Sequence, residues 1–259
     1  MGLGKLLAGL SAGGASVDTA LDDPHTRPGG TLTGEVRLAG GDMSIEVQSV
    51  GIDLVVRAEV ESGDADWTTG VPILRQPLHG GLRLDAGSRH ALRFSLTVPW
   101  ETPITAYGGW HLRGMDIGVR TDVAISRGVD KDDLDPVTVH PLPSQERVLA
   151  ALDRLGFRFT HADCEVGRLP GSSLPLYQEI ELAPPSRYAG RINQLEVTFL
   201  ARPDAMDVVL EADRRGGLLT EGRDALRRVR VEHAALDATD WERVLDEQVG
   251  QLAARRGWL

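Results

Sequence analysis

Alternation of apolar and polar residues along short runs is the feature that most constrains the fold of this chain. Within PGGTLTGEVRLAGG, residues 28–41, the side chains of Leu32, Val36 and Leu38 fall on one side of an extended backbone. The opposite side carries threonine, glutamate and arginine, and glycine-rich turns bound the run. This period of two predicts a half-buried β-strand of an antiparallel sheet. The same alternation recurs in the runs 52–60, 92–98 and 118–125.

The second half of the chain repeats the pattern after a proline-rich connector, residues 136–144. Alternating runs occupy residues 157–166, 176–182, 195–199, 206–213 and 226–231, and a short helical piece is expected at 145–154. Half-buried sheets bury their apolar faces on each other. A chain of 259 residues exceeds the usual size of one core, so two domains are expected, with one large β domain as the alternative. We predict an all-β fold of tandem antiparallel β-sandwiches, residues 1–140 and 141–236, followed by a C-terminal helix, residues 237–259.

The N-terminus predicts a short helix on the first domain. Leu3, Leu6, Leu7 and Leu10 have the i, i+3, i+4, i+7 spacing of one helical face. This face is expected to pack on its own domain. Contact with a membrane or a partner is one alternative, and a signal peptide is another.

The C-terminus also changes to a helical period. Thr239 and Glu242 have the spacing of a capping box, in which the threonine begins the helix. The apolar stripe of this helix consists of Trp241, Val244, Leu245, Val249 and Leu252. We expect the stripe to pack on the second domain, with docking of a partner or a second copy as the alternative. Trp258 lies beyond the stripe, near the end of the chain.

Composition excludes several classes of function. The formal net charge is −10 and no basic cluster occurs, which argues against nucleic-acid binding. Cys164 is the single cysteine, so no intrachain disulfide is possible and a cytoplasmic location is favoured. We interpret Cys164 as a buried, inert thiol. No run approaches the roughly 18 apolar residues that a transmembrane helix needs.

Motifs of catalysis and cofactor binding are missing from the sequence. It contains no His-Glu-x-x-His zinc pair, no Gly-x-Ser-x-Gly elbow, no dinucleotide fingerprint and no P-loop. We therefore expect no enzyme activity, no cofactor and no metal, and a hydrolase with a non-sequential active site is a distant third hypothesis. The histidines are expected to be surface or satisfied core residues.

Two further segments have alternative interpretations. The acidic run from Asp130 to Asp135 is expected to be a solvated turn, with a cation or partner-docking patch as the alternative. In AYGGWHLRG, residues 106–114, Trp110 is expected to tuck over the end of the sandwich. Its alternative role is that of an exposed interface anchor.

Three stretches resemble a known family in their order along the chain. SVDTALDDPHTRPGGTLTGEVRLAGG, residues 16–41, resembles the first strands of arrestin-like domains, and FSLTVPWETPITAYGG, residues 94–109, resembles a later strand and turn. Residues 176–215 are similar to the second domain of the bacterial stage-zero sporulation-control family known by the letter M. The resemblance implies two arrestin-type sandwiches and a cytoplasmic regulator of early sporulation without a known catalytic centre.

The resulting hypothesis is a non-enzymatic regulator or scaffold that binds other proteins. The candidate partner-binding residues are Leu3, Leu6, Leu7, Leu10, Trp110 and Trp258. The alternative is a module that binds a small molecule in the cleft between the domains, or a lipid surface through the N-terminal helix. Self-association is left open.

Overall fold

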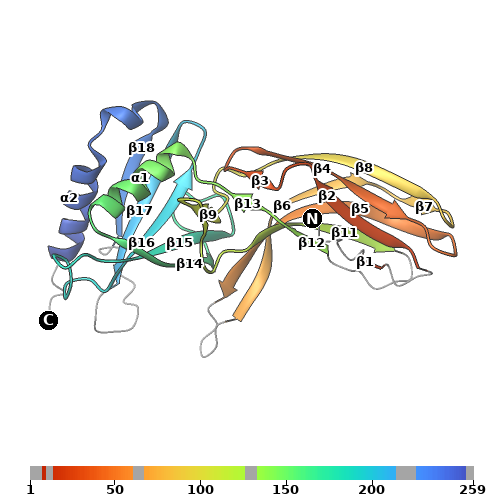
Figure 1. Cartoon of the computed structure of the whole chain (residues 1–259), viewed down its shortest axis with the longest axis horizontal. Coiled ribbons are helices and arrows are strands. Elements are labelled where there is room, and N and C mark those ends of the chain that lie inside the picture. The colour runs from red at the N-terminus through yellow and green to blue at the C-terminus, as the bar shows by residue number, and fades with distance from the viewer. Residues whose placement is uncertain (1–7, 10–13, 61–66, 126–132, 214–225, 255–259) are drawn as a thin grey trace.

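The first half of the molecule is a sandwich of two antiparallel sheets. The structure, a computed structural model, describes residues 8–9, 14–60, 67–125, 133–213 and 226–254. One sheet has the order β1-β2-β4-β8, with bounds Ala8–Gly9, Ser16–Leu21, Thr31–Ala39 and Arg89–Thr97. The facing sheet contains β5 (Ile45–Val60), β6 (Trp67–His79), β7 (Leu82–Leu84), β11 (Ile117–Ile125) and β12 (Asp133–Pro136). Figure 1 shows the two layers face to face.

The alternate apolar residues predicted from the sequence form the core of this sandwich. In β4, Leu32, Val36 and Leu38 are buried, whereas the residues between them are half-buried or exposed. Val50, Ile52 and further alternate residues of β5 meet them from the opposite sheet, because all belong to one apolar cluster. The antiparallel, mostly β class predicted from the sequence is confirmed.

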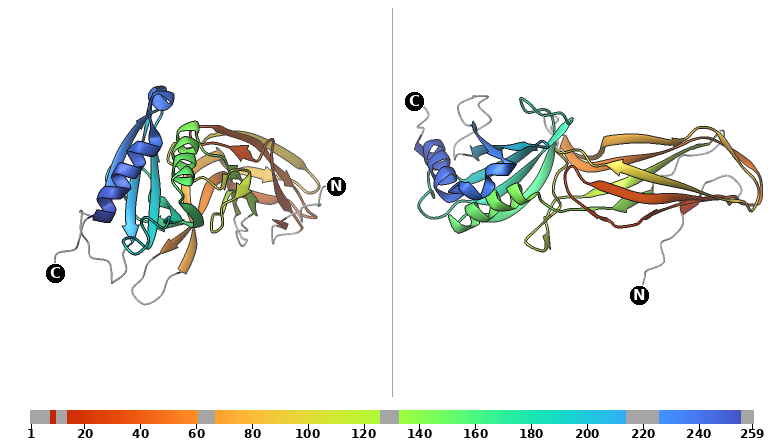
Figure 2. Two further views of the ribbon diagram at one scale, coloured as in Figure 1. Left: turned by 60° about the vertical axis from the view of Figure 1, so that its left-hand side comes forward. Right: turned by 90° about the horizontal axis from the view of Figure 1, so that it is seen from above.

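Strand β5 continues past the sandwich and joins the two halves. Its residues up to Val56 pair with β11, and Glu59 pairs in parallel with Glu165 of β14 (Arg158–Val166). The sheet then continues as β15 (Leu176–Ala183), β16 (Gln194–Ala201), β17 (Ala205–Asp213) and β18 (Leu226–Glu232). One sheet of ten strands therefore runs through both halves, as Figure 2 shows from above.

The second half has helices where a second sheet was expected. Its five described strands all belong to the ten-stranded sheet. The helices α1 (Pro143–Arg154) and α2 (Trp241–Ala254) cover one face of that sheet, and the 3-10 helix η1 (His233–Ala238) precedes α2 (Figure 1). Both helices bury an apolar stripe, which for α2 consists of Trp241, Leu245, Val249 and Leu252. Periodicity alone finds an apolar sheet face but not the type of element that covers it.

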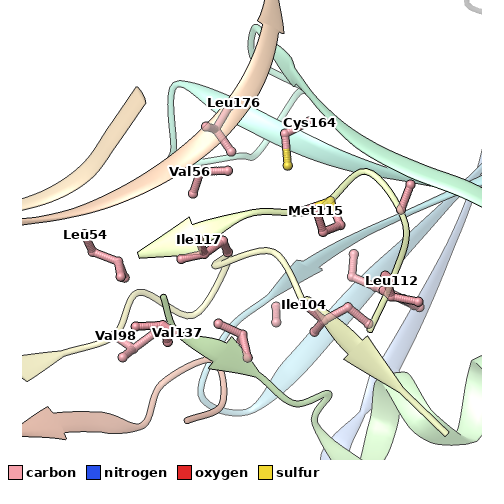
Figure 3. Packing of buried hydrophobic residues seen from close by; sticks show 14 of the residues in the cluster. Leu54, Val56, Val98, Ile104, Leu112, Met115, Ile117, Val137, Cys164 and Leu176 are labelled. Carbon is pink, nitrogen blue, oxygen red and sulfur yellow. The ribbon is translucent and has the colours of Figure 1, made fainter. Parts of the chain in front are cut away.

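A buried junction connects the halves. The main-chain N–H of Ile104 donates to Oε1 of Gln178 on β15 at 3.0 Å, and Nε2 of Gln178 donates to the carbonyl of Ile104 at 2.8 Å. Around this pair, apolar side chains from both halves interdigitate (Figure 3). They include Val56, Leu112, Met115, Ile117, Cys164 and Leu176. The junction is therefore a packed core rather than a cleft.

Two predictions about local structure need correction, and one strand was not predicted. Most of the predicted N-terminal helix lies outside the described residues, but Ala8 and Gly9 are extended and pair with β2, whose edge offers hydrogen bonds. Strand β6 escaped prediction because Pro72 and Pro77 break its alternation. At the start of α2 it is Asp240, not Thr239, whose side chain accepts from the main-chain N–H of Arg243, at 3.1 Å.

Candidate functional site

A two-stranded hairpin presents Trp110 at the surface beside the junction. The hairpin pairs β9 (Ala106–Tyr107) with β10 (Trp110–His111), and Trp110 lies directly opposite Tyr107. The two residues between the strands, Gly108 and Gly109, have φ of 60° and 84°. Two successive left-handed residues match the type I′ turn, which fits the twist of a tight hairpin and here requires glycine. The side chain of Trp110 is 79% exposed, so a well-defined turn holds a large apolar group in solvent.

The expectation that Trp110 tucks over the sandwich end is therefore wrong. The paired strands leave Trp110 on the same face of the hairpin as Tyr107, and Tyr107 occupies the nearby apolar surface instead. The Gly-Gly pair between two aromatic residues was the signal for this hairpin.

An apolar recess of about 50 Å³ lies next to the hairpin. Its lining residues come from the hairpin segment, α1, β14 and β15, and they are Tyr107, Leu112, Leu149, Leu152, Asp153, Phe157, Phe159, Ile180 and Leu182. Phe159 is 39% exposed and so also presents apolar surface to solvent. Ligand pockets usually measure about 300–1,000 Å³, so this recess fits one apolar side chain better than a whole small molecule.

Polar groups surround the recess. The carboxylate of Asp153 accepts a hydrogen bond from Nη1 of Arg158 at 2.7 Å. Burial, and then the negative charges of Asp153 and Glu146, raise the pKa of the Tyr107 phenol. Tyr107 therefore remains a neutral hydroxyl near pH 7. An apolar centre with charged neighbours is the usual anatomy of a protein contact.

The other predicted partner-binding residues cannot be placed. Leu3, Leu6, Leu7, Leu10 and Trp258 lie outside the described residues. Of the six candidates, only Trp110 is located, and the residues around it were not predicted.

The acidic run is placed only in part. Asp130 and Asp132 lie outside the described residues, and the side chain of Asp133 does too. Asp135 is buried rather than solvated, because β12 pairs with β11 and sets Asp135 opposite Val119. The interpretation as a solvated turn is therefore wrong at Asp135.

A carboxylate cluster lies on the sheet of the second half. Carboxylate oxygens of Asp163, Glu165 and Glu179 all lie within 4.8 Å of one another, and Asp163 faces Glu179 directly across β14 and β15. Burial, and next the charge of Glu196, raise the pKa of Glu179 to about 9; burial, and next Glu181, raise that of Asp163 to about 6. Three carboxylates could ligate a hard cation, but Glu179 is protonated at neutral pH and is then a poor ligand.

Sequence reasoning missed this cluster. Its members occupy polar positions of alternating strands, where carboxylates are ordinarily assigned to solvent. Only the register of β14 and β15 reveals that two carboxyl groups stand opposite each other, an arrangement that costs stability when both are charged.

One partly buried polar pair of the first half is ionic. Nη2 of Arg120 on β11 donates to Oδ2 of Asp53 on β5 at 2.7 Å, and Arg75 of β6 approaches the same oxygen at 3.8 Å. Asp53 is buried, so this pairing offsets its desolvation. Cys164 is also buried, as predicted, and burial raises the pKa of its thiol well above the ordinary value.

Comparison with known proteins identifies the family. The family model described as "SpoOM protein" matches residues 3–216. The chain belongs to the SpoOM protein family. It is 33% identical over 258 residues to "Sporulation-control protein spo0M" of Bacillus subtilis (strain 168), a match that covers 96% of this chain and 98% of the relative.

A solved structure of the SpoOM family supports the same relationship. The crystal structure of Spo0M, the sporulation control protein from Bacillus subtilis, matches with a TM-score of 0.81 at 31% identity. The match covers 92% of this chain and 98% of that chain. The family resemblance and the mostly β fold predicted from the sequence are thereby confirmed. Among the described residues, no helix combines the length and the apolar character needed to cross a membrane.

Proposed function

We propose that this chain is a non-enzymatic regulator of sporulation or cell development that acts in the cytoplasm through contacts with other proteins. The name of its Bacillus subtilis relative, a sporulation-control protein, supports the control of sporulation. The surface that we assign to partner binding is the apolar contact surface, defined as Trp110, Tyr107, Phe159 and the recess beside them.

The observation that carries this proposal is the exposure of Trp110 on a tight hairpin. An exposed tryptophan gains about 25 cal/mol per Å² of apolar area when a partner covers it. Because the turn is already ordered, little conformational entropy is lost on binding. Tryptophan is also enriched among the residues that dominate interface energy.

The adjoining recess supports a protein partner over a small molecule. Its volume suits the insertion of a single apolar side chain, with Trp110 packing alongside that side chain. Apolar side chains of both halves fill the junction, where the small-molecule alternative would place its ligand.

Affinity capture with matched variants tests the proposal. The tagged protein, its Trp110→Ala variant and its Met43→Ala variant are expressed in the native host and their partners identified by mass spectrometry. Met43 is the matched control because it is 62% exposed but lies on the loop between β4 and β5, away from the hairpin. We expect Trp110→Ala to reduce capture of a reproducible partner by tenfold or more, on the order of 1.4 kcal/mol, and Met43→Ala to retain it.

Two outcomes contradict the proposal: no reproducible partner, or partners that Trp110→Ala leaves unchanged. If the protein that Trp110→Ala fails to capture is a second copy of this chain, the contact at this surface is self-association.

A further inference from the structure

Two histidines from distant parts of the sequence lie side by side where the chain passes from the first half to the second. His25 lies in β3 (His25–Thr26), and His140 directly follows β13 (Thr138–Val139). The two strands are parallel, with Thr138 opposite His25. The main-chain N–H of His140 donates to the carbonyl of Thr26 at 2.8 Å. The backbone therefore holds the two residues side by side.

The two rings present facing nitrogen atoms. Nδ1 of His25 lies 3.0 Å from Nε2 of His140, and the stacked rings have centroids 5.2 Å apart. A hydrogen bond between imidazoles needs one donor and one acceptor nitrogen, so at least one ring is neutral. His25 is exposed and His140 is half-buried, so solvent and ions reach the pair.

The spacing of these nitrogens is an ordinary hydrogen-bond distance, and it also suits two ligands of one metal ion once the rings turn toward that ion. Imidazole nitrogens bind Zn²⁺ at about 2.0–2.1 Å, so neighbouring ligands at angles of 90–110° lie roughly 2.9–3.4 Å apart. The observed separation of 3.0 Å falls within this range, near the right-angle end. Right angles are typical of square-planar or octahedral Ni²⁺ and Cu²⁺, and imidazole suits both ions.

We propose that His25 and His140 form a binding site for a divalent late first-row transition metal such as Ni²⁺, Cu²⁺ or Zn²⁺. Nδ1 of His25 and Nε2 of His140 are its two protein ligands, and water completes the coordination. Each ring binds as the neutral imidazole. The proton shared between the facing nitrogens leaves that position, and the donor ring then carries its one proton on its other nitrogen.

Such a site would stabilise the segment that connects the two halves. β13 is followed within a few residues by α1, the first element of the second half, whereas β3 belongs to the first half. A metal that bridges His25 and His140 would add a crosslink to the backbone hydrogen bonds between β3 and β13. This inference is independent of the apolar contact surface.

Calorimetric titration of the untagged full chain with NiCl₂ tests the site. At about pH 7.5 we expect one Ni²⁺ to bind per chain. His25→Gln and His140→Gln should each weaken binding on the order of tenfold or more, because each removes one of the two ligands. His79→Gln is the matched control, because His79 is exposed and its Nδ1 instead contacts the carbonyl of Gly80. It should bind Ni²⁺ like the wild type.

The wild-type protein provides a second measurement that needs no histidine variant. A ligand that binds only the native state raises the unfolding midpoint, so excess Ni²⁺ should raise it by a few degrees at about pH 7.5. Absence of binding at millimolar Ni²⁺, or binding that both His25→Gln and His140→Gln leave intact, would overturn the proposal.

Discussion

Glu179 couples the stability of the second half to pH. Its pKa of about 9 in the folded protein exceeds the ordinary value of 4.5, so between these limits the folded state binds one proton more than the unfolded state. The free energy of unfolding must then fall as pH rises through this window, by at most about 1.4 kcal/mol per pH unit. Asp163, with its pKa raised to about 6, adds to the fall between about pH 4 and 6.

The variant Glu179→Gln should flatten this dependence. Glutamine keeps the neutral shape without a proton to lose, so we expect the variant to be about 1–2 kcal/mol more stable than the wild type at pH 7. Urea unfolding at several pH values between 5 and 9 measures both slopes. Asp42→Asn, which removes an exposed carboxylate on the β4–β5 loop, should retain the wild-type slope. Equal slopes for Glu179→Gln and the wild type would refute the pKa assignment.

Arg120 stabilises the first half by pairing with a buried carboxylate. Arg120→Ala removes the nearer cation from buried Asp53 and leaves Arg75 at 3.8 Å, so we expect the free energy of unfolding to fall by about 2–3 kcal/mol. Arg57→Ala is the matched control. Arg57 lies on β5, in the same sheet as Arg120, but its ion pair with Asp116 joins two exposed side chains. Its loss should stay below about 1 kcal/mol. Chemical denaturation compares the two, and equal losses would contradict the role given to burial.

Among the elements of the fold, the junction depends on close packing between the segment at Gly114 and strand β14. Gly114 has a φ of 97°, and a Cβ atom there would lie 2.0 Å from the carbonyl oxygen of Ala162 on β14. The preceding residue, Arg113, accepts a hydrogen bond from the N–H of Ala162 at 3.0 Å. A side chain at position 114 would therefore force the first half away from β14.

We expect Gly114→Ala to destabilise the protein by about 3 kcal/mol or more, since it adds a backbone clash to an unfavourable φ. Gly190→Ala separates these effects, because Gly190 has a φ of 82° with open space around it. Its cost should be about 1 kcal/mol. Thermal unfolding gives both values, and a loss at Gly114 no larger than at Gly190 would show that the close approach does not matter.

Local periodicity predicted most of the strands and helices, but it predicted little of how they pair and pack. The runs around β4, β11, β15 and β17 became strands, and each of them buries an apolar face. Strand β6 was missed, since Pro72 and Pro77 remove its alternation. The pairing of β5 with β14 depends on residues more than 100 positions apart, and no local pattern encodes it.

The candidate site was predictable in only one residue. Trp110 was named from the sequence as an aromatic loop residue, but its exposure follows from the turn at Gly108 and Gly109. The recess requires α1, β14 and β15 to meet the hairpin, and this depends on tertiary packing. The two facing histidines, 115 residues apart, were equally beyond the reach of spacing arguments.

At the scale of the whole molecule, the described residues of the two halves share one core and one sheet. A single apolar cluster contains residues of both halves, and the ten-stranded sheet crosses the junction. We therefore expect calorimetry to show one cooperative unfolding transition, with calorimetric and van't Hoff enthalpies in agreement. Two resolved transitions would mean that the halves fold separately and that the junction contributes little.

The most direct test of the central claim is site-specific photocrosslinking in the native host. A photoreactive amino acid replaces Trp110 in one strain and Met43 in another, and crosslinked products are identified by mass spectrometry. We expect a discrete, reproducible protein adduct from position 110 and no adduct of that mass from position 43. The same yield of the same products at both positions, or no protein adduct at position 110, would contradict a function based on contacts at this surface.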